Sequence, residues 1–206
     1  MAATSASLKG LKIGVPTSFY VDDLDGDVAK ALDNTIAVLK REGADIVKVE
    51  LPDQRQLTAA CQLVLAVEAA AYHKRWLIER PQDYGPQVLM RLQNGLAVPG
   101  VLYLEAMRWR GPALAAHVAA TANVDAVLAP VAPVAAPSIA ESDVGNSPNA
   151  EAVIQRLTRF TRTINYLGLP IGMQLIGRSF DEATLLTIGA AFQRATDFHT
   201  KVPPAG

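Results

Sequence analysis

The sequence predicts an α/β fold, a mixed β-sheet flanked by helices, and three observations support this. Short apolar runs alternate with longer segments of helical periodicity. The first three segments follow the order strand, helix, strand, which is typical of a parallel crossover. Half of the 206 residues are hydrophobic, so the composition can supply a sizeable core. We therefore expect a single α/β domain over residues 1–206, with a flexible polar lead-in at residues 1–9.

The N-terminal part of the chain predicts the β-α-β unit. The apolar run LKIGVP, residues 11–16, ends at a proline and is typical of a strand. The helix that follows can begin at Asp25 or Asp27, and Gly43 suits a left-handed cap at its end. The alternating segment DIVKVEL, residues 45–51, predicts a second strand parallel to the first.

The middle of the chain predicts three helices and a strand. A long helix is expected over residues 54–80, and a turn followed by a short helix over residues 83–95. A further helix starts near Pro99, and we expect Gly111-Pro112 to kink or break it, because proline removes a backbone donor and clashes with the preceding turn. The long helix carries an apolar stripe with one carboxylate in it: Leu57, Cys61, Val64, Glu68 and Tyr72. The run VDAVLAP, residues 124–130, predicts the third strand.

The C-terminal part predicts a loop, two helices and a strand. Residues 130–150 contain four prolines, so we expect a long loop without regular structure. An amphipathic helix is expected over residues 151–166 and a buried strand over residues 171–177. Ser179 and Glu182 fit a capping box that opens the last helix.

Composition excludes several classes of function. The formal net charge is −1, so no strong positive field favours nucleic acid or a membrane surface. No apolar run is long enough to span a bilayer, and the first ten residues lack the apolar core of a secretory signal. Cys61 is the single cysteine, which rules out an internal disulfide and suits a reducing cytoplasm. We expect a cytoplasmic protein.

The usual catalytic and metal-binding patterns are missing from the sequence. There is no G-x-S-x-G elbow, and Ser147, which precedes a proline, is typical of a turn. Cys61 lies on an apolar stripe and is interpreted as a core residue. The three histidines, His73, His117 and His199, are far apart and fit no ligand spacing. We expect neither a metal nor a cofactor.

Two charged features remain open to a structural or a functional interpretation. Glu68 lies where an apolar residue is expected, so it is a buried polar candidate that either bonds backbone amides or Tyr72, or has a function. Arg91 begins the polar side of a short helix and either faces solvent or a pocket. A row of arginines suggests a solvated face, with phosphate or acidic-partner binding as the alternative: Arg156, Arg159 and Arg162.

Several segments together resemble the C-terminal half of amidase-signature enzymes. They are LKGLKIGVP, DYGPQVLMRLQNG, VDAVLAPVAPVAAP, NYLGLP and, most specifically, GLPIGMQLIGRSFDEATLL. The resemblance runs from Leu8 to the end of the chain, and it implies a large mixed sheet between helices. It also implies hydrolysis or transfer of the acyl group of carboxamides by a serine nucleophile, assisted by a second serine and a lysine. That family places all three residues in its N-terminal half, so we expect no catalytic residue in this chain and no activity from the chain alone.

The resemblance also implies which residues form a substrate-pocket wall. The turn after the third strand resembles a family segment close to the acyl site, and its residues are Ala129, Pro130, Val131 and Pro133. Arg91 matches an arginine near the substrate in the amidotransferase subset of the family. That subset has an acidic residue where this chain has Thr158, and most members have proline where this chain has Thr163. The expected ligand is a small carboxamide.

The segment NYLGLPIGMQLIG suggests that residues are missing between two family motifs. The family carries two G-L-P-like triplets separated by about a dozen residues, the length of a strand and its turn. This chain has one, at residues 168–170. Loss of a strand would expose sheet edges, so we expect a possible homodimer. Two alternatives stay open for the function: a truncated, non-catalytic binding module and the A subunit of a tRNA-dependent amidotransferase.

Overall fold

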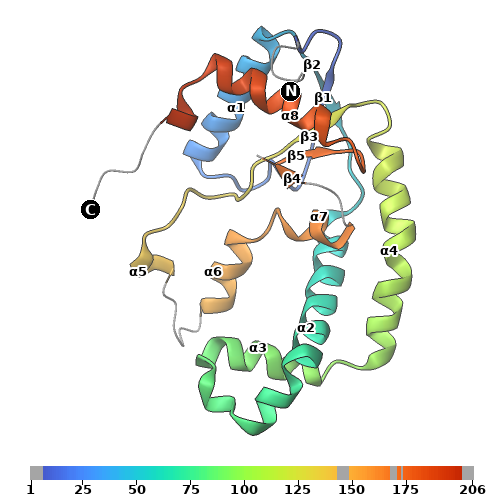
Figure 1. Ribbon diagram of the computed structural model, residues 1–206, viewed down its shortest axis with the longest axis vertical. Coiled ribbons are helices and arrows are strands. Elements are labelled where there is room, and N and C mark those ends of the chain that lie inside the picture. The colour runs from blue at the N-terminus through green and yellow to red at the C-terminus, as the bar shows by residue number, and fades with distance from the viewer. Residues whose placement is uncertain (1–6, 143–148, 168–170, 173, 201–206) are drawn as a thin grey trace. The chain divides into compact units, whose positions relative to one another are not determined.

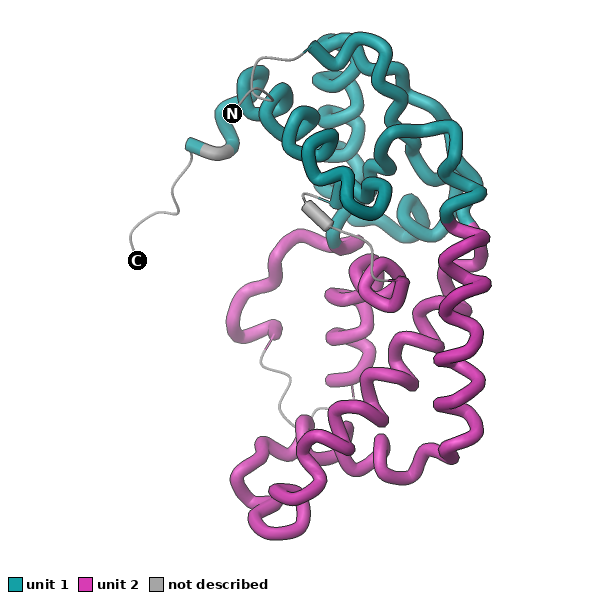
Figure 2. The backbone as a smooth tube through the Cα atoms, turned by 45° about the vertical axis from the view of Figure 1, so that its right-hand side comes forward, with its two compact units in different colours: residues 1–51, 118–131, 169–206 teal, residues 52–117, 132–168 magenta. Residues whose placement is uncertain are grey.

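The computed structural model describes residues 7–142, 149–167, 171–172 and 174–200 (Figure 1). These residues divide into two compact units (Figure 2). The sheet unit comprises residues 1–51, 118–131 and 169–206, and the helical unit comprises residues 52–117 and 132–168. The expectation of one domain over residues 1–206 stays a prediction.

The sheet unit contains a five-stranded mixed sheet, as the sequence predicts (Figure 1). Its strands lie in the order β2-β1-β3-β5-β4, and β1 runs parallel to both β2 and β3. The β3–β5 and β4–β5 pairs are antiparallel. The strands are β1 (Lys12–Pro16), β2 (Asp45–Val49), β3 (Ala126–Leu128), β4 (Ile171–Gly172) and β5 (Leu175–Gly177). All three residues of β3 are buried, which is expected for a central strand covered on both faces.

Two helices cover one face of this sheet. Helix α1 (Gly26–Arg41) contacts α8 (Glu182–Ala195), and both contribute to one hydrophobic cluster with the strands. The buried members of that cluster are Leu8, Ile13, Leu39, Ala44, Ala126, Leu128, Leu175, Ile188, Ala191 and Phe192. Gly43 has a φ of 99°, so the predicted left-handed residue after α1 is confirmed. The short 3₁₀ helix η3 (Phe198–Thr200) follows α8.

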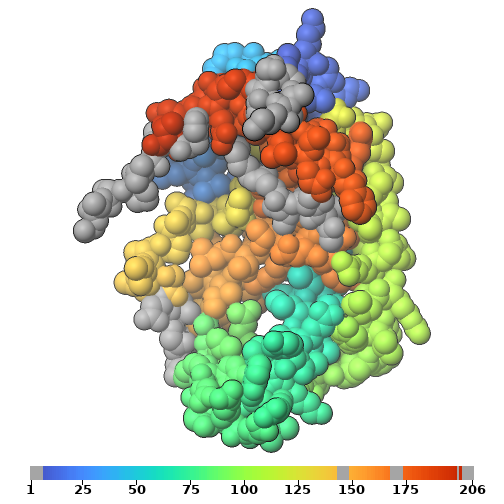
Figure 3. Space-filling view, in the orientation of Figure 1, coloured from blue at the N-terminus to red at the C-terminus, as the bar shows by residue number. Residues whose placement is uncertain are grey.

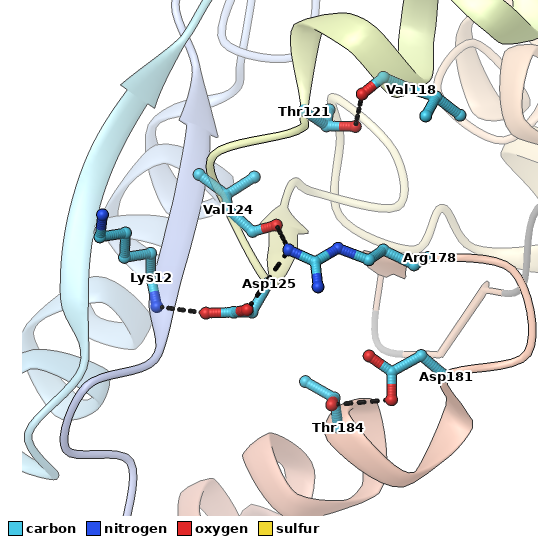
Figure 4. Close-up of polar contacts among 8 residues, drawn as sticks. All are labelled: Lys12, Val118, Thr121, Val124, Asp125, Arg178, Asp181 and Thr184. Atoms are coloured by element: carbon cyan, nitrogen blue, oxygen red, sulfur yellow. Dashed lines mark hydrogen bonds and ion pairs between the residues drawn. The ribbon is translucent and has the colours of Figure 1, made fainter.

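A polar cluster joins the starts of β1 and β3 to the end of β5 (Figure 4). The Asp125 carboxylate accepts a hydrogen bond from the Lys12 amide at 2.9 Å, and the Asp125 amide donates to the Lys12 carbonyl at 2.8 Å. Arg178 donates to the Val124 carbonyl at 3.0 Å and lies 3.5 Å from the Asp125 carboxylate. This explains the arginine that follows β5, because its side chain satisfies a carbonyl just before β3.

The helical unit is built on the long helix α2 (Gln54–Glu79), which confirms the expected helix to within one residue. Helix α2 contacts both α3 (Pro86–Leu96) and α7 (Arg162–Leu167). Helix α4 (Gly100–Ala120) reaches α2 through Tyr103, whose hydroxyl donates to the Glu68 carboxylate at 3.1 Å. The remaining elements are η2 (Pro81–Asp83), α5 (Ile139–Ser142) and α6 (Ala150–Leu157).

Helices α2 and α3 approach each other at Gly95. A Cβ at this position would lie 2.1 Å from the Ala66 carbonyl oxygen and 2.8 Å from the Ala70 Cβ. Real side chains do not tolerate such distances, and the nearest atom belongs to the α2 backbone, which cannot move aside cheaply. Glycine is therefore required at this crossing for steric reasons.

Several sequence expectations about element boundaries are wrong. Helix α4 is not broken at Pro112, whereas the expectation of a kink there stays a prediction, and the predicted loop over residues 130–150 contains α5. A capping box explains α5: Ser138 Oγ accepts from the Glu141 amide, and the Glu141 carboxylate accepts from the Ser138 amide at 2.8 Å. The capping box expected at residues 179–182 is not formed, because α8 begins after Asp181 without a side-chain cap.

The helix expected over residues 151–166 and the strand expected over residues 171–177 are each divided in two. Between α6 and α7, the Thr158 hydroxyl donates to the Ile154 carbonyl at 2.7 Å and the Thr161 hydroxyl donates to the Thr158 carbonyl at 3.3 Å. Such side chains compete with the helical hydrogen bonds. The expected strand forms the hairpin β4–β5, in which Gln174 has a φ of 42°, outside the extended region.

No helix in the described ranges is long and apolar enough to cross a membrane.

Substitution of Gly95 by alanine should destabilise the protein. The added methyl group must push α3 away from α2, and overpacking of this kind costs about 1–3 kcal/mol. Urea unfolding followed by circular dichroism measures the change. Gly189→Ala is the matched control, because Gly189 is inside α8 and a Cβ there would meet no neighbouring atom within 4 Å. That control should be neutral or slightly stabilising. Equal stability of Gly95→Ala and the parent chain would contradict the packing.

Stability should fall as the pH is lowered from about 6.5 toward 4. His117, on α4, is 2% exposed, and its burial lowers the pKa of the imidazole to about 4. The unfolded chain therefore takes up this proton at a higher pH than the folded chain. The linked loss of stability, complete below about pH 4, is on the order of 3 kcal/mol.

Urea-unfolding free energies at several pH values measure this loss, with His117→Gln as the comparison. The variant lacks the titrating group, so its stability should fall less over the same pH range. Identical pH slopes in both proteins would show that His117 does not carry the effect.

Candidate functional site

A pocket of about 430 Å³ lies inside the helical unit, where α2, α3, α6 and α7 meet. Figure 3 shows the surface hollowed where the cyan, green and orange segments of these helices come together. The pocket has an apolar wall, made by Leu65, Ala66, Ala69, Val88 and Leu92. Its polar groups are Gln62, Arg91, Asn94, Glu151, Gln155 and Arg162. An apolar cleft with a few convergent polar groups is the usual form of a small-molecule site.

Arg91 reaches the pocket because α3 lies against α2. Helix α3 starts with Pro86 in its first turn, where the missing amide costs no helical hydrogen bond. Arg91 then lies one turn before Gly95 on the same side of the helix, the side that meets α2. Its guanidinium is 3.7 Å from the Glu151 carboxylate. The structure therefore places this predicted residue in a pocket, and its part in substrate binding stays a prediction.

Glu151 supplies the carboxylate of the pocket. It lies in the first turn of α6, where the helix dipole favours a negative charge. The Gln155 side-chain amide donates to it at 2.9 Å, one turn along the same helix. Thr158 is the position that is acidic in the amidotransferase subset by resemblance. In this chain, its hydroxyl donates to the Ile154 carbonyl. The acidic group beside Arg91 thus comes from a position seven residues earlier in the chain.

Arg162 is the buried charge of the pocket. It is 8% exposed and stands at the first residue of α7, directly after the turn that separates α6 from α7. Burial lowers the pKa of its guanidinium, the neighbouring Arg91 lowers that pKa further, and Glu151 and Cys61 oppose both. The expected arginine row therefore does not share one solvated face, because Arg156 is exposed and Arg162 is buried.

Cys61 lies near this charge, and Tyr166 lies near Cys61. Burial raises the pKa of the Cys61 thiol, and Arg162 acts against that increase. Tyr166, on α7, donates its hydroxyl to the Ala106 carbonyl on α4, and burial raises the pKa of its phenol. Cys61 is half-buried on α2, which agrees with its interpretation as a structural cysteine.

The expectation that Glu68 is buried is wrong. Glu68 is exposed, and Tyr72, its expected partner, is 73% exposed. The buried residues of α2 explain the error: Leu57 and Leu77 are twenty positions apart, about five and a half turns, so they face opposite sides. The buried side of α2 changes along its length, and a single stripe cannot describe it. Glu68 accepts its hydrogen bond from Tyr103 instead.

The other predicted pocket residues follow β3, and they do not all belong to the same compact unit as Arg91. Ala129, Pro130 and Val131 belong to the sheet unit, whereas Pro133 and Arg91 belong to the helical unit. Ala129 is buried, and its amide donates to the Gln174 carbonyl at 3.1 Å. Val131 is 53% exposed. Their role in substrate binding also stays a prediction.

The two histidines whose side chains the structure describes, His73 and His117, lie on different helices. His73 lies on α2 with its Nδ1 2.8 Å from the Tyr84 hydroxyl, and His117 is buried on α4. Within the described ranges, no three His, Cys, Asp or Glu side chains form a group that could hold a metal ion. Ser147 and the side chain of His199 lie outside the described residues.

Sequence reasoning missed Arg162 and Glu151 as pocket residues. The helical period alone places Arg162 in line with Arg159 on a polar face. Only the break at residues 158–161 turns it inward, and the threonines in that segment are the signal that could have shown the break.

Comparisons with known proteins show similarity along most of the chain. The family model described as Amidase matches residues 1–186. An amidase from Pseudomonas putida is 34% identical, over 95% of this chain and 45% of the relative. The A subunit of the Glutamyl-tRNA(Gln) amidotransferase of Chromobacterium violaceum is 31% identical, over 96% of this chain and 48% of the relative. The chain thus spans about half the length of the curated relatives it matches.

Solved structures show the same fold. A crystal structure of an amidase superposes with a TM-score of 0.77 at 24% identity, over 92% of this chain and 46% of that one. A bacterial aryl acylamidase of the amidase-signature family gives a TM-score of 0.73 at 17% identity, over 96% of this chain and 46% of that one. The predicted fold class is confirmed.

The chain is also shorter than its relatives within the matched region. The alignment with the Pseudomonas putida amidase is 210 residues long, although it covers 95% of a chain of 206. The relative therefore has residues without a counterpart here. The predicted deletion at residues 168–170 lies outside the described residues, and its position stays a prediction.

Cys61 should react slowly with a thiol reagent. Its raised pKa leaves little thiolate at pH 7.5, and thiolate is the reactive form. We expect iodoacetamide to alkylate the folded chain at least roughly tenfold more slowly than the chain in guanidinium chloride. Mass spectrometry measures the reaction without ambiguity, because there is one cysteine. Equal rates in the two conditions would contradict a half-buried, structural thiol.

Proposed function

This chain belongs to the amidase family, and we propose that it is the C-terminal portion of a carboxamide hydrolase, contributing a wall of the substrate pocket and not the nucleophile. The observation that carries the proposal is the partial match. The family model covers residues 1–186, while the chain spans 45% of the Pseudomonas putida amidase. The sequence contains no glycine- and serine-rich nucleophile segment, which supports placing that segment in the other half.

The chemistry follows from what each half supplies. By resemblance, a serine of the N-terminal half attacks the carboxamide carbon, the amine leaves with a proton, and water then releases the acid. A second serine and a lysine move the protons, and backbone amides stabilise the oxyanion. Without these groups the present chain can bind a substrate but lacks the nucleophile that hydrolysis requires.

This chain contributes groups that bind and orient. Arg91 and the polar residues of the helical pocket can hold a substrate away from its reacting bond. The segment Ala129–Pro133 supplies a rigid, proline-bounded turn after β3, which suits a fixed pocket wall. Binding energy from such remote contacts lowers the barrier when it holds the amide in the reactive geometry.

The A subunit of a Glutamyl-tRNA(Gln) amidotransferase is the second candidate, because proteins of that name are 29–32% identical to this chain. Thr158 counts against it, since this position is acidic in that subset by resemblance. The Glu151 carboxylate beside Arg91 counts in its favour, because it supplies an acidic group next to the same arginine.

The isolated chain should release no ammonia from carboxamides. A coupled assay with propionamide, benzamide and glutamine measures the release, and the Pseudomonas putida amidase serves as the active control. A chimera should recover turnover of at least one of these amides. It joins this chain to the part of that amidase which precedes its aligned region.

Turnover by the isolated chain would show that the nucleophile lies within it and would overturn the proposal. An inactive chimera that still binds a carboxamide would favour the non-catalytic binding module. Turnover of glutamine alone by the chimera would favour the amidotransferase.

A further inference from the structure

The pocket of the helical unit contains a guanidinium without a counter-charge in contact. Arg162 is 8% exposed and lines the pocket, and no hydrogen bond or ion pair connects its guanidinium to any residue of the described ranges. A buried charge that lacks a partner is costly. The cost falls when a ligand supplies the missing acceptor, so the side chain points to an anionic ligand.

The charge balance of the pocket supports an anion. Its charged lining residues are Arg91, Arg162 and Glu151, which leaves one positive charge in excess. Glu151 is 3.7 Å from Arg91 and also accepts from Gln155, so its direct contacts go to other residues, and its attraction to Arg162 acts without an ion pair. Burial lowers the pKa of Arg162 and the neighbouring Arg91 lowers it further, while Glu151 and Cys61 raise it by less than these two effects.

The lining defines the rest of the ligand. A volume of about 430 Å³ suits a small molecule. The apolar residues Leu65, Ala69 and Val88 can cover a short hydrocarbon body, and the side-chain amides of Gln62 and Asn94 can hydrogen-bond a polar end. A single excess charge matches a monoanion better than a dianion, and a planar carboxylate matches the two-pronged donor face of a guanidinium.

We propose that the pocket between α2, α3, α6 and α7 binds a small organic carboxylate, with Arg162 holding the carboxylate group. Leu65, Ala69 and Val88 cover the body of the ligand, and Arg91, already paired with Glu151, contributes long-range attraction. The identification of this ligand as an acid-bearing carboxamide substrate rests on the function proposed above. The binding itself does not, because it requires only residues of this chain.

Calorimetric titration of the intact chain tests the site with glutaramate, the monoamide of glutarate. The neutral diamide glutaramide is the matched probe without the carboxylate, and inorganic phosphate is the matched probe without the organic body. We expect glutaramate to bind at least about tenfold more tightly than either, because it alone provides both the charge and the body. Equal binding of glutaramide, or equal binding of phosphate, would overturn the proposal, as would the absence of glutaramate binding.

Two substitutions in the pocket and one control outside it locate the bound group. Arg162→Gln should weaken glutaramate binding by at least about tenfold, whereas Arg156→Gln, an exposed arginine of α6 outside the pocket, should leave it unchanged within about twofold. Glu151→Gln should tighten binding several-fold, because it removes the only negative charge of the pocket lining. Glu151 is 45% exposed, so this variant keeps the test decisive if Arg162→Gln does not fold.

The outcomes separate this inference from the proposed function. If neither Arg162→Gln nor Glu151→Gln changes the affinity, the carboxylate is not bound in this pocket. An inactive chimera leaves the binding result untouched, and failed binding leaves amide hydrolysis by the chimera untouched.

Discussion

The crossing of α3 over α2 at Gly95 is the constraint on which the pocket depends. Ala66, whose carbonyl oxygen would lie 2.1 Å from a Cβ at position 95, also lines the pocket wall. The close contact that excludes a side chain at Gly95 therefore also fixes the position of α3 against α2. Arg91 extends from α3 one turn before Gly95. Because the constraint lies between backbone atoms and not between flexible side chains, the wall is rigid, and a rigid wall loses little entropy when a ligand binds.

Charge placement on this wall departs from the usual surface pattern. Arginines spaced three residues apart ordinarily lie on a solvent-exposed face, where hydration stabilises each charge. Here the turn at residues 158–161 rotates Arg162 inward, while Arg156 stays in solvent. Arg162 is thus a buried cation of the pocket without an ion pair among the described residues, and groups with strongly perturbed pKa values are concentrated at functional sites.

Local signals in the sequence predicted much of the fold. The β-α-β unit, Gly43 and the extent of α2 followed from periodicity and cap residues, which act over a few neighbours. The sequence did not predict the exposure of Glu68, because the buried side of α2 depends on which helix lies against each of its turns. Arg91 was identified by resemblance. Glu151 and Arg162 line the pocket because the expected single helix is divided into α6 and α7, and the sequence did not predict that division. The capping box at Ser138 and Glu141 was present in the sequence, but the surrounding prolines led to the prediction of a loop without regular structure.

The position of β3 affects how the protein folds. Its two neighbours in the sheet, β1 and β5, come from opposite ends of the chain and are joined to it by the polar cluster around Asp125. The sheet unit is therefore assembled from three separated segments, with contacts of large sequence separation that form slowly. During synthesis, β3 leaves the ribosome well before β5, its antiparallel partner. One edge of this apolar strand therefore stays unpaired until residues 175–177 have been synthesised. A chaperone that shields this edge should raise the yield of folded chain.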